Sequence, residues 1–164
     1  LLKRHIHALT KKGKASLISV DFERADVSSL SSAMLYQRKI TLRKQPQLLL
    51  LVPEIEMVLS GKFYILLLFG SYAKGEARQD SDIDFLLMVP DTEKKDLYQE
   101  TISKALELYP KIKKDFKVIF LSDFREMLQQ KYTVGRSAFQ QSIVLFGVEP
   151  YYSMVKNYVR TQGY

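Results

Sequence analysis

The amino-acid sequence predicts a mixed α/β domain that follows a short basic module made of a β-hairpin and a helix. Two nearly continuous apolar runs, at 63–69 and 83–89, have the length of strands that are buried on both faces of a sheet. Segments with apolar residues at helical spacing alternate with these runs, which favours an α/β arrangement. The chain has 164 residues, enough for one domain of ordinary size and a small appendage.

The N-terminal module starts with two β-prone runs, at 5–10 and 15–20, on either side of the basic sequence Lys11-Lys12-Gly13-Lys14. A short glycine-containing connection between two such runs predicts a β-hairpin. The tip of this hairpin is expected to be strongly basic.

A helix is expected to begin at Asp26 or Ser28 and to end near residue 37, followed by a basic polar link at 38–45. We therefore divide the chain into a basic hairpin-and-helix module, 1–45, and an α/β domain, 46–164.

Helices and strands are expected to alternate in the α/β domain. Proline and glycine mark the ends of these elements, because proline does not continue a helix and glycine favours turns. The part from residue 133 onward is expected to be helical in pieces, broken at Gly147 and Pro150. The expected elements are a helix at 48–59, strands at 63–69, 83–89 and 116–121, and helices that start at 91 or 92 and at 122 or 123 and end near 108 and 130.

The net charge of +7 is concentrated at the N-terminal end of the chain. Residues 1–44 contain ten basic and three acidic residues, whereas the remainder contains fifteen of each. Such an asymmetry indicates either a polyanionic partner for the basic segment or a solubility role.

Several classes of protein and site are excluded by composition. The absence of cysteine rules out a disulfide scaffold, a thiolate metal site and a cysteine nucleophile, and it fits a reducing compartment such as the cytoplasm. No apolar run reaches the roughly 18 residues that a membrane-spanning helix needs, so no membrane partner is expected. The chain begins with Leu1 rather than methionine, and we expect further residues to precede it.

A glycine and a serine follow directly after the first apolar strand. Gly70 permits an unusual turn or a close backbone approach. Ser71 is a favourable N-cap for a short helix, and Gly75 is a favourable C-cap. A strand that ends at a helix start presents free backbone N–H groups, which suit a phosphate.

Two aspartates lie at the start of the next apolar strand. Asp82 and Asp84 are two residues apart, so their carboxylates lie on the same side of the strand. Like charges in a core strand repel each other and are expensive to bury without a partner. A divalent cation would relieve this repulsion, and Mg²⁺ prefers carboxylates together with phosphate oxygens. The pattern therefore predicts metal-assisted phosphoryl or nucleotidyl transfer.

The segment resembles the small, minimal nucleotidyltransferases of the DNA polymerase β superfamily. Their signature is Gly-Ser, ten residues, and Asp-x-Asp; here Gly70-Ser71 is followed by ten residues and then by Asp82-Ile83-Asp84. The resemblance covers about residues 48–122. It implies a nucleotidyltransferase fold with a mixed sheet flanked by helices. It also implies Mg²⁺-dependent transfer of a nucleoside monophosphate, AMP from ATP first, to a hydroxyl group of a protein or small molecule.

The resemblance also implies roles for individual residues. Gly70 and Ser71 would hold the nucleotide phosphates, and Asp82 and Asp84 would be the catalytic metal ligands for Mg²⁺. Lys74 would contact a phosphate, or would be an ordinary solvated lysine.

Members of this superfamily carry a third acid on a later strand, and here the sequence departs from the pattern. The register that we favour from the sequence places Lys117 at the position of that acid, with Asp115 two residues earlier on the same face. Asp115 would complete the site if the strand end is close enough. Otherwise Lys117 would neutralise the aspartates, and the chain would be a catalytically inactive, antitoxin-like binding or regulatory protein.

The resemblance suggests partners as well. Minimal members of the family pair with HEPN-domain proteins in toxin–antitoxin modules, so a HEPN-type protein is an expected partner. The basic hairpin followed by a helix is similar to the wing of a winged-helix DNA-binding domain whose recognition helix would precede Leu1. The alternative is a hairpin that packs on the sheet or mediates a homodimer.

Overall fold

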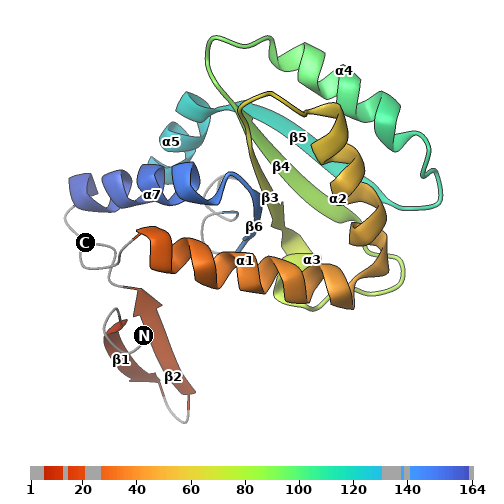
Figure 1. The fold of residues 1–164 in the computed structure, drawn as a ribbon. Helices are drawn as coiled ribbons and strands as arrows, with labels where there is room; N and C mark the ends of the chain where they lie inside the picture. Colours follow the sequence, from red (N-terminus) through yellow and green to blue (C-terminus); the bar gives the residue numbers. More distant parts are fainter. Residues whose placement is uncertain (1–5, 13–14, 21–26, 131–137, 139–140, 163–164) are drawn as a thin grey trace.

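The computed structural model describes residues 6–12, 15–20, 27–130, 138 and 141–162 of the chain. Within these residues the strands form two separate sheets, one of two strands and one of four. Figure 1 shows the four-stranded sheet between helices and the two-stranded sheet at the N-terminal end.

The N-terminal strands form the hairpin that the sequence predicts. β1 (Ile6–Lys12) and β2 (Ala15–Val20) pair in antiparallel fashion, from Ile6 opposite Val20 to Lys12 opposite Ala15. Lys11 lies at the tip end of β1, as expected, and Lys14 lies outside the described residues. The comparison of this hairpin with a wing stays a prediction.

The main sheet has the strand order β5-β4-β3-β6. β3 (Ile65–Phe69) and β4 (Ile83–Val89) form its antiparallel centre, and their apolar side chains are almost entirely buried. β5 (Lys114–Phe120) runs parallel to β4, and β6 (Ile143–Phe146) runs antiparallel to β3. This mixed sheet confirms the predicted mixed α/β class.

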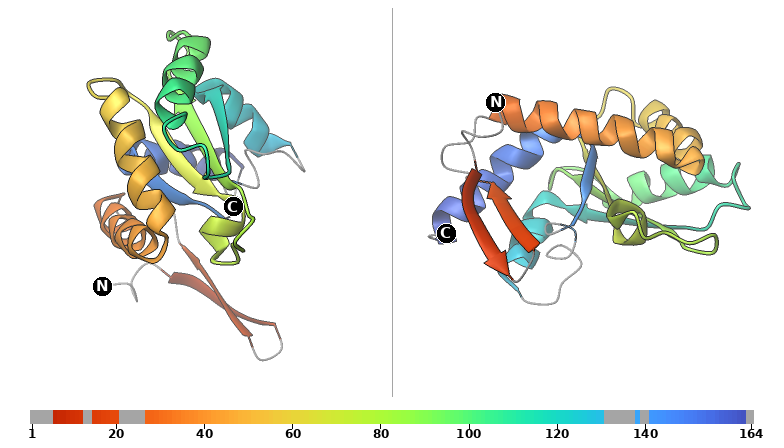
Figure 2. Two further views of the ribbon diagram at one scale, coloured as in Figure 1. Left: turned by 90° about the vertical axis from the view of Figure 1, so that its right-hand side faces the viewer. Right: turned by 90° about the horizontal axis from the view of Figure 1, so that it is seen from below.

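Helices cover both faces of the main sheet (Figures 1 and 2). α2 (Pro46–Val58) and α4 (Lys95–Leu106) contribute to one buried apolar cluster. α5 (Leu121–Gln129) and α7 (Val148–Gln162) contribute to a second cluster on the other face. The alternate side chains of each central strand divide between these two clusters, as the two-residue period of a strand requires.

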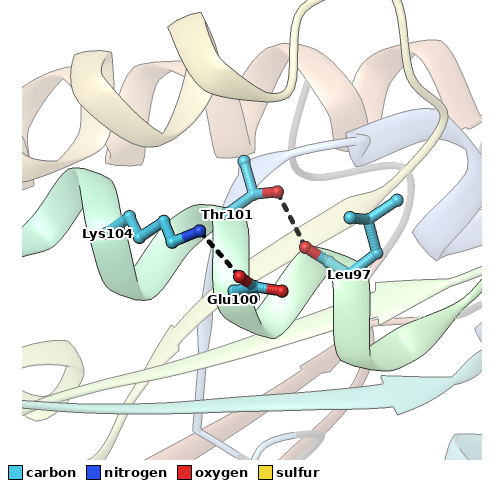
Figure 3. A network of polar contacts seen from close by, with 4 residues as sticks. All are labelled: Leu97, Glu100, Thr101 and Lys104. Atoms are coloured by element: carbon cyan, nitrogen blue, oxygen red, sulfur yellow. Dashed lines mark hydrogen bonds and ion pairs between the residues drawn. The ribbon is translucent and has the colours of Figure 1, made fainter.

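α4 illustrates how one helix presents a buried face and a solvated face. Tyr98, Ile102 and Leu106 pack into the core. On the outer face, Lys104 Nζ donates to Glu100 Oε1 at 2.7 Å and Thr101 Oγ1 donates to the carbonyl oxygen of Leu97 (Figure 3). These contacts are the i,i+4 pairs typical of an exposed helix surface.

α1 (Val27–Lys44) is longer than the sequence analysis predicts. The basic link expected at 38–45 is wrong, because residues 38–44 continue the helix. Leu42 packs against the core, and Arg38 Nη2 lies 2.5 Å from Glu56 Oε1 of α2. These contacts hold the basic segment in helical form, and α1 also contacts β6 and α7.

The C-terminal part differs from the expectation of broken helical pieces. Residues 143–146 form an edge strand, and α7 continues through Pro150. Pro150 lies in the first turn of α7, where a backbone N–H has no partner within the helix, so proline is tolerated there. Within the part of the chain that the structure describes, every helix is too short or too polar to cross a membrane.

Candidate active site

The site begins where β3 ends and its chain turns sharply at Gly70. Gly70 has a φ of +68°, and a Cβ atom placed on it would overlap the carboxylate of Asp84, with the Asp84 Cγ only 3.0 Å away. Phe69 and Asp84 are register partners in the β3–β4 pair. Glycine is therefore required at residue 70 for two reasons, its backbone conformation and the carboxylate against its α-carbon.

A short helix, α3 (Gly70–Lys74), follows this turn. Ser71 is not its N-cap, as the sequence analysis expects, because the helix already begins at Gly70 and the extended Phe69 precedes it. The prediction for Gly75 is confirmed, since it ends the helix with a left-handed φ of +74°. Tyr72 is 6% exposed and anchors α3 in the core, whereas Ser71 is half-buried and Lys74 is exposed.

The loop between α3 and β4 is held by specific hydrogen bonds. The backbone N–H of Arg78 donates to Ser81 Oγ at 2.9 Å, and the Ser81 N–H donates to the Arg78 carbonyl oxygen at 3.1 Å. Lys113 Nζ reaches the Asp80 carbonyl oxygen at 3.4 Å. Ser81 thus orients the chain just before Asp82, as the sequence analysis predicts.

Asp82 and Asp84 lie on either side of the fully buried Ile83. Asp82 is exposed and Asp84 is half-buried. Asp84 shares its strand face with Leu86, which belongs to the apolar cluster of α5 and α7, so both carboxylates lie on that face of the sheet. The spacing of the two aspartates therefore has the geometric effect that the sequence predicts.

The third acid in this region is Asp115 on β5. In the parallel β4–β5 pair, Asp115 is the register partner of Asp84, whereas Lys117 is the partner of Leu86. The strand register therefore favours the alternative in which Asp115 stands beside the two aspartates. Lys117 lies on the same face and its Nζ is 3.1 Å from Asp115 Oδ2.

The electrostatics of the site are those of crowded carboxylates. Burial raises the pKa of Asp84 above its ordinary value, the neighbouring Asp115 raises it further, and Asp82 adds a smaller increase. Lys117 opposes these effects and lowers this pKa. Negative charge at Asp84 is thus only partly compensated by the chain itself.

A divalent cation is the natural partner for this charge. The donors are carboxylate oxygens, which Mg²⁺ prefers, and Asp84 and Asp115 occupy adjacent positions on neighbouring strands. Among the described residues, however, no three acidic, histidine or cysteine side chains converge closely enough to hold a metal as they stand. The residues fit such an ion by type and by strand face, while Asp115 is engaged by Lys117.

The domain described above also matches a known family. A family described as polymerase beta, nucleotidyltransferase, matches residues 54–148, from α2 to the first residue of α7. The chain belongs to this nucleotidyltransferase family. The match confirms the resemblance and the fold predicted from the Gly-Ser and Asp-x-Asp signature, and it includes Gly70, Asp84 and Asp115.

One solved structure similar to this nucleotidyltransferase domain is described as the crystal structure of a toxin–antitoxin with AMP-PNP. The similarity has a TM-score of 0.42 at 21% sequence identity and covers 68% of this chain and 89% of that chain. A search among curated proteins found no match.

Proposed function

We propose that the chain transfers a nucleoside monophosphate, AMP from ATP, to a hydroxyl group of a protein or small molecule, with Mg²⁺ and release of pyrophosphate. The observation that carries this proposal is the register of β4 and β5, which sets Asp115 opposite Asp84. Together with Asp82, this register supplies the three carboxylates that the family chemistry uses.

Each residue has a chemical role in this proposal. Gly70 and Ser71 hold the phosphates of the nucleotide, and Lys74 on the exposed side of α3 contacts a phosphate oxygen. Asp82 and Asp84 hold Mg²⁺ through their carboxylate oxygens. When bound, Mg²⁺ neutralises the phosphate oxygens and makes the α-phosphorus more reactive.

Asp115 takes the proton of the acceptor hydroxyl on a carboxylate oxygen. The acceptor oxygen then forms its bond to the α-phosphorus as the bond to pyrophosphate breaks. The ion pair with Lys117 must open for this step, because that pair occupies Asp115 Oδ2.

The acceptor is proposed to be a second protein. A domain of this size encloses little of a large substrate by itself, so a HEPN-type partner, or a second copy in a homodimer, would complete the acceptor site. This proposal extends the family membership and is tested separately from nucleotide binding.

The direct test uses labelled ATP, Mg²⁺ and a candidate HEPN-type partner. We expect label on the partner with the wild-type chain and none with Asp84→Asn. Asp96→Asn is the matched control, because Asp96 is an exposed aspartate on α4, away from the site. Failure of the wild-type chain both to bind MgATP and to transfer label would contradict the proposal.

A second candidate function is favoured by the Lys117–Asp115 ion pair. A chain whose third carboxylate stays paired would keep the fold without catalysis and would act as a regulatory protein that binds DNA through its basic hairpin. DNA affinity that falls steeply with salt, and that is lost when Lys11, Lys12 and Lys14 are neutralised, would support this function.

A further inference from the structure

A groove of about 900 Å³ lies at the end of β3 opposite to Gly70. Its walls are formed by α1, by residues 61–64 and by the junction of β6 with α7. Tyr64 in the groove directly precedes β3, and Gly70 directly follows it. The length of β3 therefore separates the groove from the candidate active site by roughly 16 Å.

The groove exposes large apolar side chains. Leu35 on α1 is 51% exposed, Phe63 is 50% exposed and Phe146 on β6 is 39% exposed. The Phe146 ring stacks on the buried Tyr64 ring, with the ring centroids 4.2 Å apart. A rigid aromatic surface thus faces an apolar helix residue across the groove.

Two polar atoms of α1 in this groove lack partners. Ser31 is only 6% exposed, and its Oγ has no hydrogen-bond partner. Arg38 Nε is likewise buried and unpaired, although Arg38 Nη2 contacts Glu56. Buried polar groups are nearly always hydrogen-bonded, so two unpaired groups in one groove indicate an acceptor that comes from outside.

These groups form a regular pattern along α1. Ser31, Leu35 and Arg38 are spaced i, i+4 and i+7, so they lie on one side of the helix with the apolar residue between the two donors. Seven residues of helix span about 10.5 Å, which is about the length of three residues of extended chain.

The charges of the groove favour a neutral occupant. Arg38 and Lys62 are balanced by Glu56 and Glu149, so the groove offers no excess positive charge to a phosphate or a nucleic acid. Backbone carbonyl groups are neutral acceptors that occur at regular intervals along an extended peptide.

We propose that this groove binds an extended, uncharged segment of a partner protein. An apolar side chain of that segment inserts between Leu35 and Phe146, and its backbone carbonyl oxygens accept hydrogen bonds from Ser31 Oγ and Arg38 Nε. This mode combines main-chain hydrogen bonds with a side-chain pocket. Binding here leaves the Gly70 and Asp84 site open, so the inference does not depend on nucleotide transfer.

The test pans the full chain with a phage-displayed library of random linear peptides and measures synthetic copies of the enriched peptides by fluorescence anisotropy. We expect uncharged peptides with a large apolar residue. Leu35→Glu should weaken their binding at least about tenfold, because the new charge would be buried by the peptide. Leu97→Glu is the matched control, since Leu97 on α4 is also 51% exposed, and it should change nothing.

Ser31→Ala is the second variant, and it removes only an unpaired hydroxyl, so the fold should tolerate it. Loss of one hydrogen bond to the peptide should weaken binding about 2- to 10-fold. Three outcomes would overturn the proposal: no enrichment of peptides, equal affinity for wild type and both groove variants, or displacement of the peptides by MgATP.

Discussion

Lys117 Nζ lies 3.1 Å from Asp115 Oδ2, two residues along β5 from the position that faces Asp84. The ammonium group therefore occupies an oxygen that the proposed chemistry needs. In the described structure, the chain provides its own cation for the third carboxylate.

Replacement of Lys117 by methionine is expected to strengthen divalent-cation binding. The ammonium group competes with the ion for Asp115 and also repels it, and an exposed pair of this kind is worth enough to change affinity by about 2- to 5-fold. Mn²⁺ titration followed by electron paramagnetic resonance measures this affinity without any turnover. Lys111→Met, at an exposed lysine outside the site, is the control; unchanged or weaker binding in Lys117→Met would show that the ion does not reach Asp115.

Replacement of Gly70 by alanine is expected to destabilise the fold by about 2–4 kcal/mol, because the new Cβ meets a left-handed backbone and the Asp84 carboxylate. Gly75 has a similar φ but open space around it, so Gly75→Ala should cost about 1 kcal/mol. Urea unfolding measures both free energies. In the Asp84→Ala background the penalty of Gly70→Ala should shrink toward that of Gly75→Ala; an undiminished penalty would mean that the carboxylate is not its cause.

The raised pKa of Asp84 gives a pH dependence with a definite sign. Because the folded state binds this proton more readily than the unfolded state does, ionised Asp84 lowers stability above its raised pKa, and stability is regained as the pH falls through it. Asp84→Asn should therefore raise the melting temperature at pH 7, and the difference should vanish in acid where Asp84 is protonated in both states. Asp96→Asn should not raise the melting temperature, because Asp96 lies in the first turn of α4, where negative charge is favourable.

The contact between Arg38 and Glu56 predicts that α1 contributes to the stability of the domain. Arg38→Met should destabilise the chain by about 1 kcal/mol, since it leaves the partly buried Glu56 carboxylate without its partner. A double-mutant cycle with Glu56→Gln isolates the interaction. Strictly additive effects of the two substitutions would show that this contact does not couple α1 to α2.

The central strands could be predicted from sequence because their signal is local. The apolar run at 83–89 coincides with β4, since a strand buried on both faces needs apolar residues throughout. β6 has only four residues, too few to show a period, and its pairing with β3 is a contact between distant segments. The length of α1 depends on contacts such as that of Arg38 with Glu56, which an isolated basic segment does not reveal.

The candidate site shows the same division. The positions of Asp82 and Asp84 follow from the period of one strand, so the sequence alone places them together. The position of Asp115 depends on the register between two parallel strands that are joined through α4. A shift of two residues would exchange Asp115 for Lys117 opposite Asp84, and no local pattern distinguishes these two registers.

The contact between Gly70 and the Asp84 carboxylate has a consequence for how this family signature tolerates change. The two ends of the Gly-Ser to Asp-x-Asp segment touch each other, so the residues between them form a closed loop whose ends are clamped by the sheet. Its exposed part around Gln79 bears no share of that clamp. Length variation there should leave the spacing between phosphate and metal ligands intact, which makes the contact, rather than the count of ten residues, the feature that defines the motif.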